Sequence, residues 1–244
     1  MIGSVFRTNE GYDAIVVKYL NKYNVFIQIQ DCNKHEMWVH LNALRKGQVK
    51  NPFHRSVMSV GFIGVGDYKV SLLGDHTPAY ACWKAMITRC YSGVYHNGKP
   101  TYLECKVSPE WQNFQVFAEW YYNQPNHLIF ELDKDILIKG NKTYSENTCC
   151  MIPSVLNALL TKRHLHRGLL PIGVCRNKLK YEAHLNMRGR RKSLGLSATA
   201  SGAFDLYKRA KENYIRDLVE NDFSEVLGDN IKQALLRYTV EIND

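Results

Sequence analysis

The chain has 244 residues, 45% of them hydrophobic, and its 32 Lys and Arg against 23 Asp and Glu give a formal net charge of +9. This apolar content excludes disorder along the whole chain. No apolar run approaches the roughly 18 residues of a membrane-spanning helix, and residues 1–10 do not resemble a signal peptide, so we expect no membrane partner. The seven cysteines include the neighbours Cys149 and Cys150, which favours reduced thiols and a cytoplasmic location over a disulfide framework.

Residues 1–66 are predicted to form a small β-barrel domain. Three stretches with the β-branched or alternating character of strands lie at 14–19, 25–30 and 36–41. Gly61, Gly64 and Gly66 then interrupt regular structure, so we place a domain boundary after them. No Lys-Ser or Lys-Thr pair follows these glycines at the spacing of a phosphate-binding loop.

Residues 67–161 are predicted to form a mixed α+β domain. Two pairs of a capping residue and a proline, at 77–78 and 108–109, mark the starts of helices. The aromatic residues that follow recur at helical spacing, which predicts that they fill the core rather than stack on bases. Further along, 130–138 is predicted as a strand and 154–160 as a helix.

Residues 165–220 are predicted to form a third domain, a three-stranded antiparallel sheet packed on one helix. The expected elements are strands near 172–175, 180–186 and 191–196 and a helix over 201–220, and residues 221–244 follow as a helical tail. The middle strand alternates, with Tyr181, Ala183 and Leu185 on an apolar face and polar residues on the other. The predicted fold class is therefore α+β with several domains.

The positive charge is concentrated in one segment. Residues 162–216 hold 14 basic and three acidic residues, whereas residues 217–244 hold seven acidic and two basic ones. Such an asymmetry is typical of a nucleic-acid footprint, although a solvated basic face would look the same. We therefore expect a polyanion as partner, and double-stranded DNA first.

The basic segment resembles the APETALA/ethylene-response-factor DNA-binding domain. The matching pieces are Gly173-Val174, Tyr181-Glu182-Ala183-His184-Leu185, Leu194-Gly195 and Thr199-Ala200. The resemblance implies that the open sheet face reads DNA while flanking cations hold phosphates. The face that reads DNA in that family corresponds here to Cys175, Asn177, His184, Asn186, Arg191 and Ser193. With the basic residues around this face included, the residues that we assign to DNA are Arg176, Lys178, Lys180, His184, Asn186, Arg188, Arg190, Arg191 and Lys192. Cys175 and Ser193 replace an arginine and a tryptophan typical of the plant domains, so no plant site preference is transferred.

A second resemblance covers the middle of the chain. The pieces that carry it are Tyr80-x-x-Trp83-x-x-Met86-x-x-Arg89-Cys90-Tyr91, Glu110-Trp111-x-x-Phe114-x-x-Phe117, Leu132-Asp133-Lys134-Asp135-Ile136-Leu137 and Gly140-Asn141-Lys142. Together they are similar to phage-borne proteins grouped with HNH homing endonucleases, which often carry an APETALA-type domain. This resemblance implies a phage or mobile-element protein in a bacterial host that cleaves DNA with a divalent cation.

The chemistry of an HNH nuclease needs a divalent cation, a histidine base and an asparagine that orients it. Asp133 and Asp135, two apart on a predicted strand, are assigned to Mg²⁺ or another divalent cation, with solvent-facing charges on an edge strand as the alternative. Asn147 or Asn157 is assigned to the orienting role. Lys134 stands where the histidine is expected, so the alternative function is a catalytically inactive DNA-binding regulator on a nuclease-derived scaffold.

The cysteines and the aromatic residues bear on two more hypotheses, a structural zinc and an RNA partner. Cys90, Cys105 and Cys149 could belong to a zinc site, but they lack paired Cys-x-x-Cys spacing, so buried reduced thiols are the first expectation. RNA binding would need exposed stacking aromatic residues on the sheet, and residues 180–186 offer none on their polar face. No small-molecule cofactor is expected, and no pattern in the sequence predicts an oligomeric state.

Overall fold

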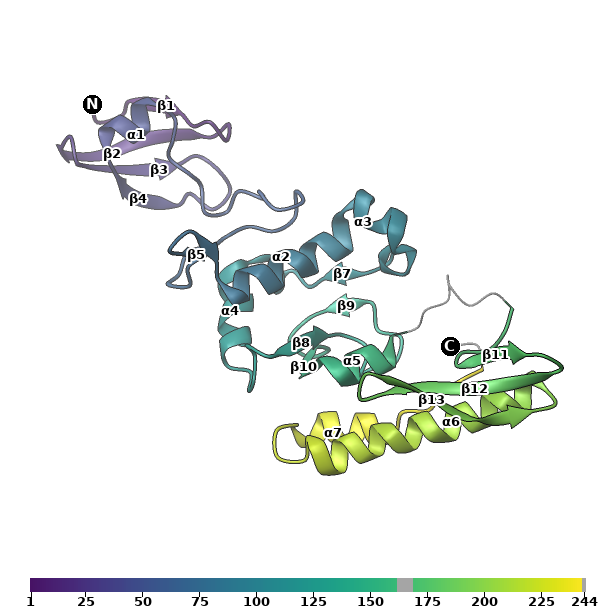
Figure 1. Cartoon of the computed structure of the whole chain (residues 1–244). Coiled ribbons are helices and arrows are strands. Elements are labelled where there is room, and N and C mark those ends of the chain that lie inside the picture. The colour runs from purple at the N-terminus through teal and green to yellow at the C-terminus, as the bar shows by residue number, and fades with distance from the viewer. Residues whose placement is uncertain (162–168, 243–244) are drawn as a thin grey trace. The chain divides into compact units, whose positions relative to one another are not determined.

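The computed structural model describes residues 1–161 and 169–242. The chain divides into two compact units, Met1–Tyr121 and Tyr122–Asp244 (Figure 1). Both combine helices with small sheets, which confirms the predicted α+β class. Within the described ranges, no helix is both long enough and apolar enough to cross a membrane.

The first unit begins with an open antiparallel sheet and a short helix. These are β1 (Val5–Arg7), β2 (Asp13–Asn21), β3 (Asn24–Ile29), β4 (Glu36–Val39) and α1 (Leu41–Arg45). The strand order is β1-β2-β3-β4, so β1 and β4 are edges and the predicted closed barrel is wrong. The barrel does not close because the chain after β4 continues as α1 and turns instead of a further strand of this sheet. Ala14, Val25 and Ile27 pack against Leu41 and Leu44 beneath the sheet.

The remainder of the first unit is mainly helical. Its elements are β5 (Ser71–Leu72), β6 (Asp75–His76), α2 (Pro78–Tyr91), α3 (Gly93–Gly98), a 3₁₀ turn (Pro100–Tyr102), β7 (Lys106–Val107), a second 3₁₀ turn (Glu110–Gln112) and α4 (Phe114–Tyr122). The start of α2 is as predicted, since Thr77 Oγ1 accepts a hydrogen bond of 3.3 Å from the Tyr80 N–H. The start of α4 comes later than predicted, because the residues after Pro109 first form the 3₁₀ turn.

The aromatic stripes of α2 and α4 form the core of this part of the chain. Trp83, Trp111, Phe114 and Phe117 are all almost fully buried, which confirms the predicted core role. The Trp83 indole Nε1–H donates a hydrogen bond of 2.7 Å to the Trp111 carbonyl, so its polar atom is satisfied inside the core.

The second unit begins with a strand–strand–helix element. β8 (Phe130–Asp133) pairs antiparallel with β10 (Cys150–Pro153), and α5 (Ser154–Leu160) follows β10 directly, while β9 (Thr143–Tyr144) lies in the intervening loop. The predicted strand 130–138 is too long. It ends at Asp133 because Asp133 Oδ1 accepts hydrogen bonds from the backbone N–H groups of Asp135 (2.7 Å) and Ile136 (2.9 Å), which turn the chain.

The rest of the second unit is a three-stranded sheet and its helices. These are β11 (Val174–Asn177), β12 (Lys180–Met187), β13 (Arg190–Ser197), α6 (Ala200–Asp217), a π-helical turn (Leu218–Asp222) and α7 (Asp229–Leu236). The sheet is antiparallel in the order β11-β12-β13, and α6 covers one of its faces (Figure 1). Thr199 caps α6 by accepting a hydrogen bond of 3.1 Å from the Gly202 N–H.

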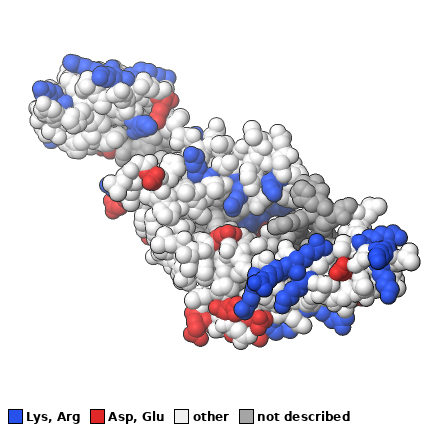
Figure 2. Space-filling model, viewed as in Figure 1, with Lys and Arg blue, Asp and Glu red and all other residues white. Residues whose placement is uncertain are grey.

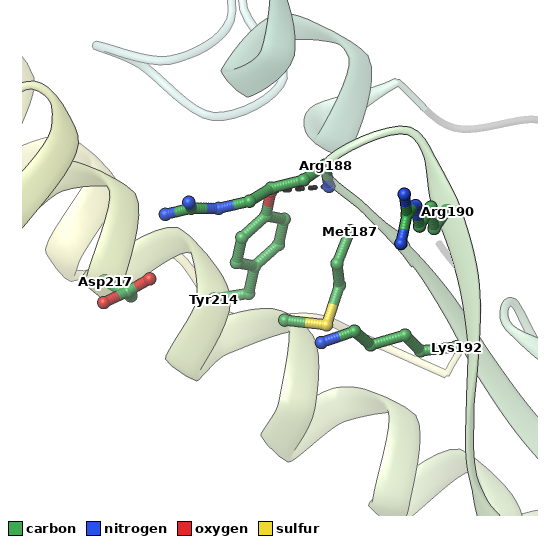
Figure 3. A pocket seen from close by; sticks show the side chains of 6 residues that line it. All are labelled: Met187, Arg188, Arg190, Lys192, Tyr214 and Asp217. Carbon is green, nitrogen blue, oxygen red and sulfur yellow. Dashed lines mark hydrogen bonds between the residues drawn. The ribbon is translucent and has the colours of Figure 1, made fainter.

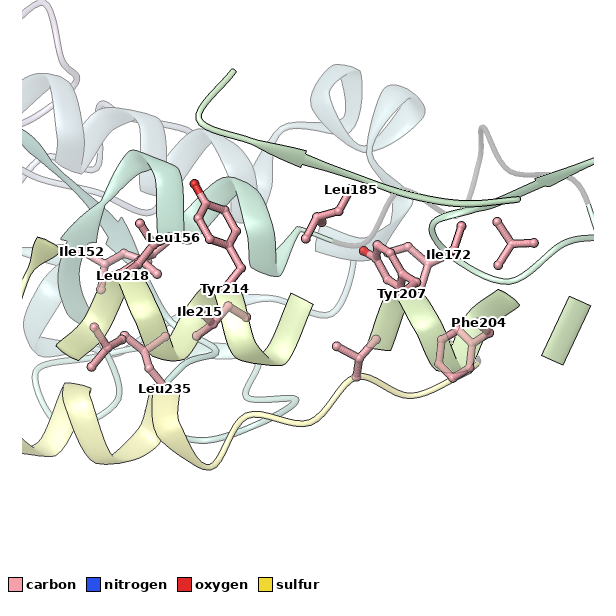
Figure 4. Close-up of a cluster of buried hydrophobic side chains, with 14 of the residues drawn as sticks. Ile152, Leu156, Ile172, Leu185, Phe204, Tyr207, Tyr214, Ile215, Leu218 and Leu235 are labelled. Atoms are coloured by element: carbon pink, nitrogen blue, oxygen red, sulfur yellow. The ribbon is translucent and has the colours of Figure 1, made fainter. Parts of the chain in front are cut away.

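One hydrophobic core joins these elements (Figure 4). Ile152 and Leu156 from β10 and α5 belong to the same cluster as Leu185 of the sheet, Tyr207 of α6 and Val240 near the end of the chain. Residues on both sides of the range 162–168, which the structure does not describe, therefore share one core.

Two glycines of the sheet have the same positive backbone angle in different surroundings. Gly173, which precedes β11, and Gly189, in the turn between β12 and β13, both have φ of +75°. A Cβ at Gly173 would overlap the Tyr207 ring, whereas a Cβ at Gly189 would meet no atom within 4 Å. Residue 173 must therefore be glycine for two reasons. Its φ is positive, and the Tyr207 ring leaves no room for a Cβ atom.

Candidate nucleic-acid interface

The three-stranded sheet has one buried face and one open face. In β12, Ala183 and Leu185 are buried on the side of α6, and the residues between them point the other way. The strand register brings together the residues of this open face, which we call the outer face: Cys175, Asn177, Lys180, Glu182, His184, Asn186, Arg191, Ser193 and the exposed Leu196.

The predicted DNA-binding residues are divided between the two sides of the sheet. Lys180, His184, Asn186 and Arg191 belong to the outer face. Arg176, Arg190 and Lys192 pair with Tyr181, Met187 and Leu185 respectively, so they lie on the side of α6. Lys178 and Arg188 lie in the two turns. Lys162, Arg163 and Arg167 of the basic segment are outside the described residues. Consecutive residues of a strand point to opposite faces of the sheet, so basic residues that are adjacent in the sequence are divided between the two faces.

Glu182 is at the centre of the outer face and was not among the predicted site residues. Its carboxylate accepts hydrogen bonds from Ser193 Oγ (2.5 Å) and Asn177 Nδ2 (3.0 Å). These two bonds, with help from the nearby Arg191, lower the pKa of Glu182 below its ordinary value. A fixed, ionised acceptor therefore faces outward. The alternation of β12 already places this side chain beside Lys180 and His184, and it could have been identified from the sequence.

His184 and Arg191 are neighbours of that carboxylate. Partial burial, and secondly the positive charge of Arg191, lower the pKa of His184, so its imidazole is neutral at pH 7. Within the described residues, the buried His184 Nδ1 has no hydrogen-bond partner. Arg191 is exposed and contacts Cys175 Sγ at 3.6 Å through one guanidinium nitrogen, leaving its other N–H groups open to solvent. The outer face thus offers both donors and acceptors.

Positively and negatively charged side chains gather in different parts of the second unit (Figure 2). Lys and Arg side chains lie along the β12–β13 hairpin, and Asp and Glu side chains gather around α7. The acidic residues of this second region are Asp217, Glu220, Asp222, Glu225 and Asp229. A polyanion is attracted to the sheet and repelled from the α7 end, and the field alone therefore favours one orientation.

The two carboxylates of the predicted metal-binding pair have different partners in the structure. Asp133 Oδ1 is used in capping the turn that follows β8, and burial raises the pKa of this carboxyl above its ordinary value. Asp135 is more exposed and forms a 2.7 Å ion pair with Lys134 Nζ. The expectation that both aspartates lie on one strand is wrong, because β8 ends at Asp133.

The Lys134 ammonium occupies the position beside the Asp135 carboxylate that a divalent cation would need. Its side chain is buried, and its ammonium donates to Asp135 Oδ1 (2.7 Å) and the Asn141 carbonyl (3.0 Å), while lying 5.9 Å from the centre of the Tyr144 ring. A divalent cation at this carboxylate would have to displace the ammonium and would meet its positive charge. These residues, as arranged, do not fit a Mg²⁺ site, and we derive no chemical step through one.

The two predicted asparagines have no hydrogen bond to that turn among the described residues. Asn157 on α5 donates a 2.6 Å hydrogen bond from Nδ2 to Glu131 Oε2 of β8, so it ties the helix to the strand. Asn147 is exposed in the loop before β10. A third asparagine, Asn141, donates to the backbone carbonyls of Lys134 and Thr143 and holds the loop in shape. The structure does not gather these side chains around a reacting centre.

Cys149 and Cys150 of the second unit are buried thiols. Desolvation raises the pKa of Cys149 to about 12 and raises that of Cys150 as well, so both are protonated at neutral pH. Zinc binds the thiolate form, which this environment disfavours. Among the described residues, no group of three or more His, Cys, Asp or Glu side chains is close enough to hold a metal ion.

Comparison with known proteins provides no relative from which to argue. No protein-family model matches the sequence, and neither a curated protein nor a solved structure matches the chain. Among the described residues, the outer face of the three-stranded sheet holds the largest group of polar and charged side chains suited to binding a partner.

Proposed function

We propose that the protein binds double-stranded DNA with the outer face of the β11-β12-β13 sheet against the major groove. The observation that carries the proposal is the composition of this face, where a fixed carboxylate at the centre lies on the same face as the exposed cations Lys180 and Arg191. A β-ribbon fits the width of the major groove, and base edges there present a distinct pattern of donors and acceptors for each pair.

Individual roles follow from side-chain chemistry. Asn186 and Arg191 are directly opposite in the strand register. An asparagine can contact adenine through two hydrogen bonds, and an arginine can do the same with guanine or bind a phosphate. Glu182 can accept from a cytosine amino group, and Lys180 at the other end of the strand suits a phosphate. The resemblance to the APETALA-type domain supports the same use of this sheet.

Cleavage of DNA is the second candidate function. The observation that favours it is the β8–β10–α5 element, a strand–strand–helix arrangement such as an HNH nuclease uses. Against it stand the turn-capping role of Asp133 and the ammonium of Lys134 beside Asp135. We therefore place the DNA-binding regulator first and the endonuclease second, and in both cases propose a phage or mobile-element origin on the resemblance alone.

DNA binding is tested by fluorescence anisotropy with a labelled duplex pool at several salt concentrations. We compare Arg191→Ala with Arg209→Ala, which removes an exposed arginine of α6 outside the outer face. Arg191→Ala should weaken binding about tenfold, and the slope of log K against log salt should fall by about 0.9 if a phosphate contact is lost. Equal effects of the two variants would reject the outer face as the DNA-binding surface.

Cleavage is tested with plasmid DNA in Mg²⁺, Mn²⁺ or EDTA. Asp133→Asn keeps the Oδ1 acceptor of the turn, Asp135→Asn removes the ion pair with Lys134, and Asp205→Asn on α6 is the control. Metal-dependent cleavage that both site variants abolish, and the control retains, would establish the nuclease. Cleavage that survives in both site variants would mean that the protein is a nuclease whose active site does not include these two carboxylates. Tight binding without cleavage is the outcome expected of the regulator.

A further inference from the structure

A pocket lies on the other side of the sheet, between the tip of the β12–β13 hairpin and α6 (Figure 3). It has a volume of about 560 Å³ and is lined by Met187, Arg188, Arg190, Lys192, Tyr214 and Asp217. Pockets of roughly 300–1,000 Å³ are typical of small-molecule sites. The outer face and this pocket are on opposite sides of the same two strands, so one ligand surface does not include both.

The pocket has an excess of positive charge at the hairpin. Arg190 and Lys192 point to the side of α6 because they are opposite Met187 and Leu185 in the register. Neither cation has a hydrogen bond or ion pair with any residue that the structure describes. Arg188 is different, since its guanidinium is paired with Asp222 at 3.2 Å. Two cations in one concave site are therefore available to an anion.

The remaining lining residues give the pocket an apolar side chain and hydrogen-bonding groups. Met187 supplies an apolar wall, while Tyr214, which also lines the pocket, is almost fully buried. The Tyr214 hydroxyl accepts a 3.0 Å hydrogen bond from the Arg188 N–H, which leaves its own hydrogen for one more acceptor. Asp217, which is exposed at the α6 side of the pocket, can accept a hydrogen bond from a ligand (Figure 3).

We propose that this pocket binds a nucleoside phosphate, either as a free nucleotide or as one nucleotide unit of a strand. The phosphate lies between Arg190 and Lys192, the sugar or base packs on Met187, and a sugar hydroxyl or base amino group donates to Asp217. The site goes beyond the proposed duplex-binding face. It also accounts for the cations of the hairpin that the outer face does not use.

Isothermal titration calorimetry of the full chain tests the proposal with three probes: a nucleoside monophosphate, the same nucleoside without phosphate, and inorganic phosphate. We expect the monophosphate to bind, phosphate to bind more weakly, and the nucleoside not to bind. Arg190→Gln and Lys192→Gln should each weaken monophosphate binding about tenfold. Arg209→Gln on α6 should leave it unchanged, and circular dichroism verifies that all variants are folded. No monophosphate binding at millimolar concentration, or equal binding by Lys192→Gln and the wild type, would overturn the proposal.

A labelled single-stranded oligonucleotide separates the two sources of the phosphate. If a strand is the ligand, the oligonucleotide binds more tightly than the monophosphate, and Lys192→Gln weakens both. If a free nucleotide is the ligand, the monophosphate binds and the oligonucleotide does not compete with it. Duplex binding is measured on the same preparations. Because Arg191→Ala acts on the opposite face, a failure of the duplex proposal and a failure of the pocket proposal give different results.

Discussion

A pair of glycine substitutions tests the packing that places the sheet on α6. Gly173→Ala and Gly189→Ala introduce the same methyl group at the same φ of +75°, and only the first brings it against Tyr207. An alanine held in the left-handed region costs about 1 kcal/mol at either position. At 173 the overlap with the ring adds about 2 kcal/mol, the usual cost of overpacking a core. We therefore expect about 1 kcal/mol for Gly189→Ala and about 3 kcal/mol for Gly173→Ala.

The assay can separate the two units of the chain. All four tryptophans, Trp38, Trp83, Trp111 and Trp120, are in the first unit, so tryptophan fluorescence follows that unit alone. Far-UV circular dichroism also includes α6 and α7 of the second unit. At about 4 °C per kcal/mol, the dichroism transition of the second unit should fall by about 12 °C in Gly173→Ala and about 4 °C in Gly189→Ala.

The fluorescence transition should be the same in the wild type and both variants. Equal shifts of the dichroism transition in the two variants would refute the reasoning, because they would mean that Tyr207 does not pack against residue 173. A shift of the fluorescence transition would instead mean that the units unfold together.

Three further predictions concern single residues. Thr77→Ala removes the cap of α2 and should lower the stability of the first unit by about 1 kcal/mol, seen as a shift of the tryptophan fluorescence transition only. The pKa of His184 is lowered in the folded state, so the unfolded chain takes up this proton at a higher pH than the folded chain does. The free energy of unfolding should therefore fall as pH decreases below about 6.5. In denaturant titrations at several pH values, His184→Gln should make this fall less steep. Iodoacetamide at pH 7.5 should modify the exposed Cys32 well before Cys149 or Cys150, whose pKa values are raised by burial; comparable labelling by mass spectrometry would contradict their burial.

Much of the secondary structure could be predicted because local signals specify it. The cap at Thr199 and the apolar spacing of residues 203–218 identify α6, and the alternation of residues 180–187 identifies the two faces of β12. These signals depend on the period of a helix or strand and on hydrogen bonds within a few residues. They need no knowledge of the rest of the fold.

The candidate site could be predicted only in part, because spatial grouping depends on details that sequence patterns do not show. Asp133 and Asp135 read as neighbours on one strand, yet the Asp133 carboxylate accepts hydrogen bonds from the backbone of the next turn and the strand ends before Asp135. Arg190, Arg191 and Lys192 read as one basic cluster, yet the register sends Arg191 to the outer face and the other two to the pocket. Both errors come from treating closeness in sequence as closeness in space.

The position of Val240 has a consequence for synthesis of the protein. Val240 is fully buried in the core of the second unit, where its N–H donates to Glu212 Oε1 at 2.9 Å and its carbonyl accepts from Lys208 Nζ at 2.7 Å. The ribosome completes the first unit once Tyr121 has emerged, so that unit can fold during translation. The second unit must wait for Val240 to leave the exit tunnel. Until then the apolar side of α6 lacks part of the core that covers it in the folded protein.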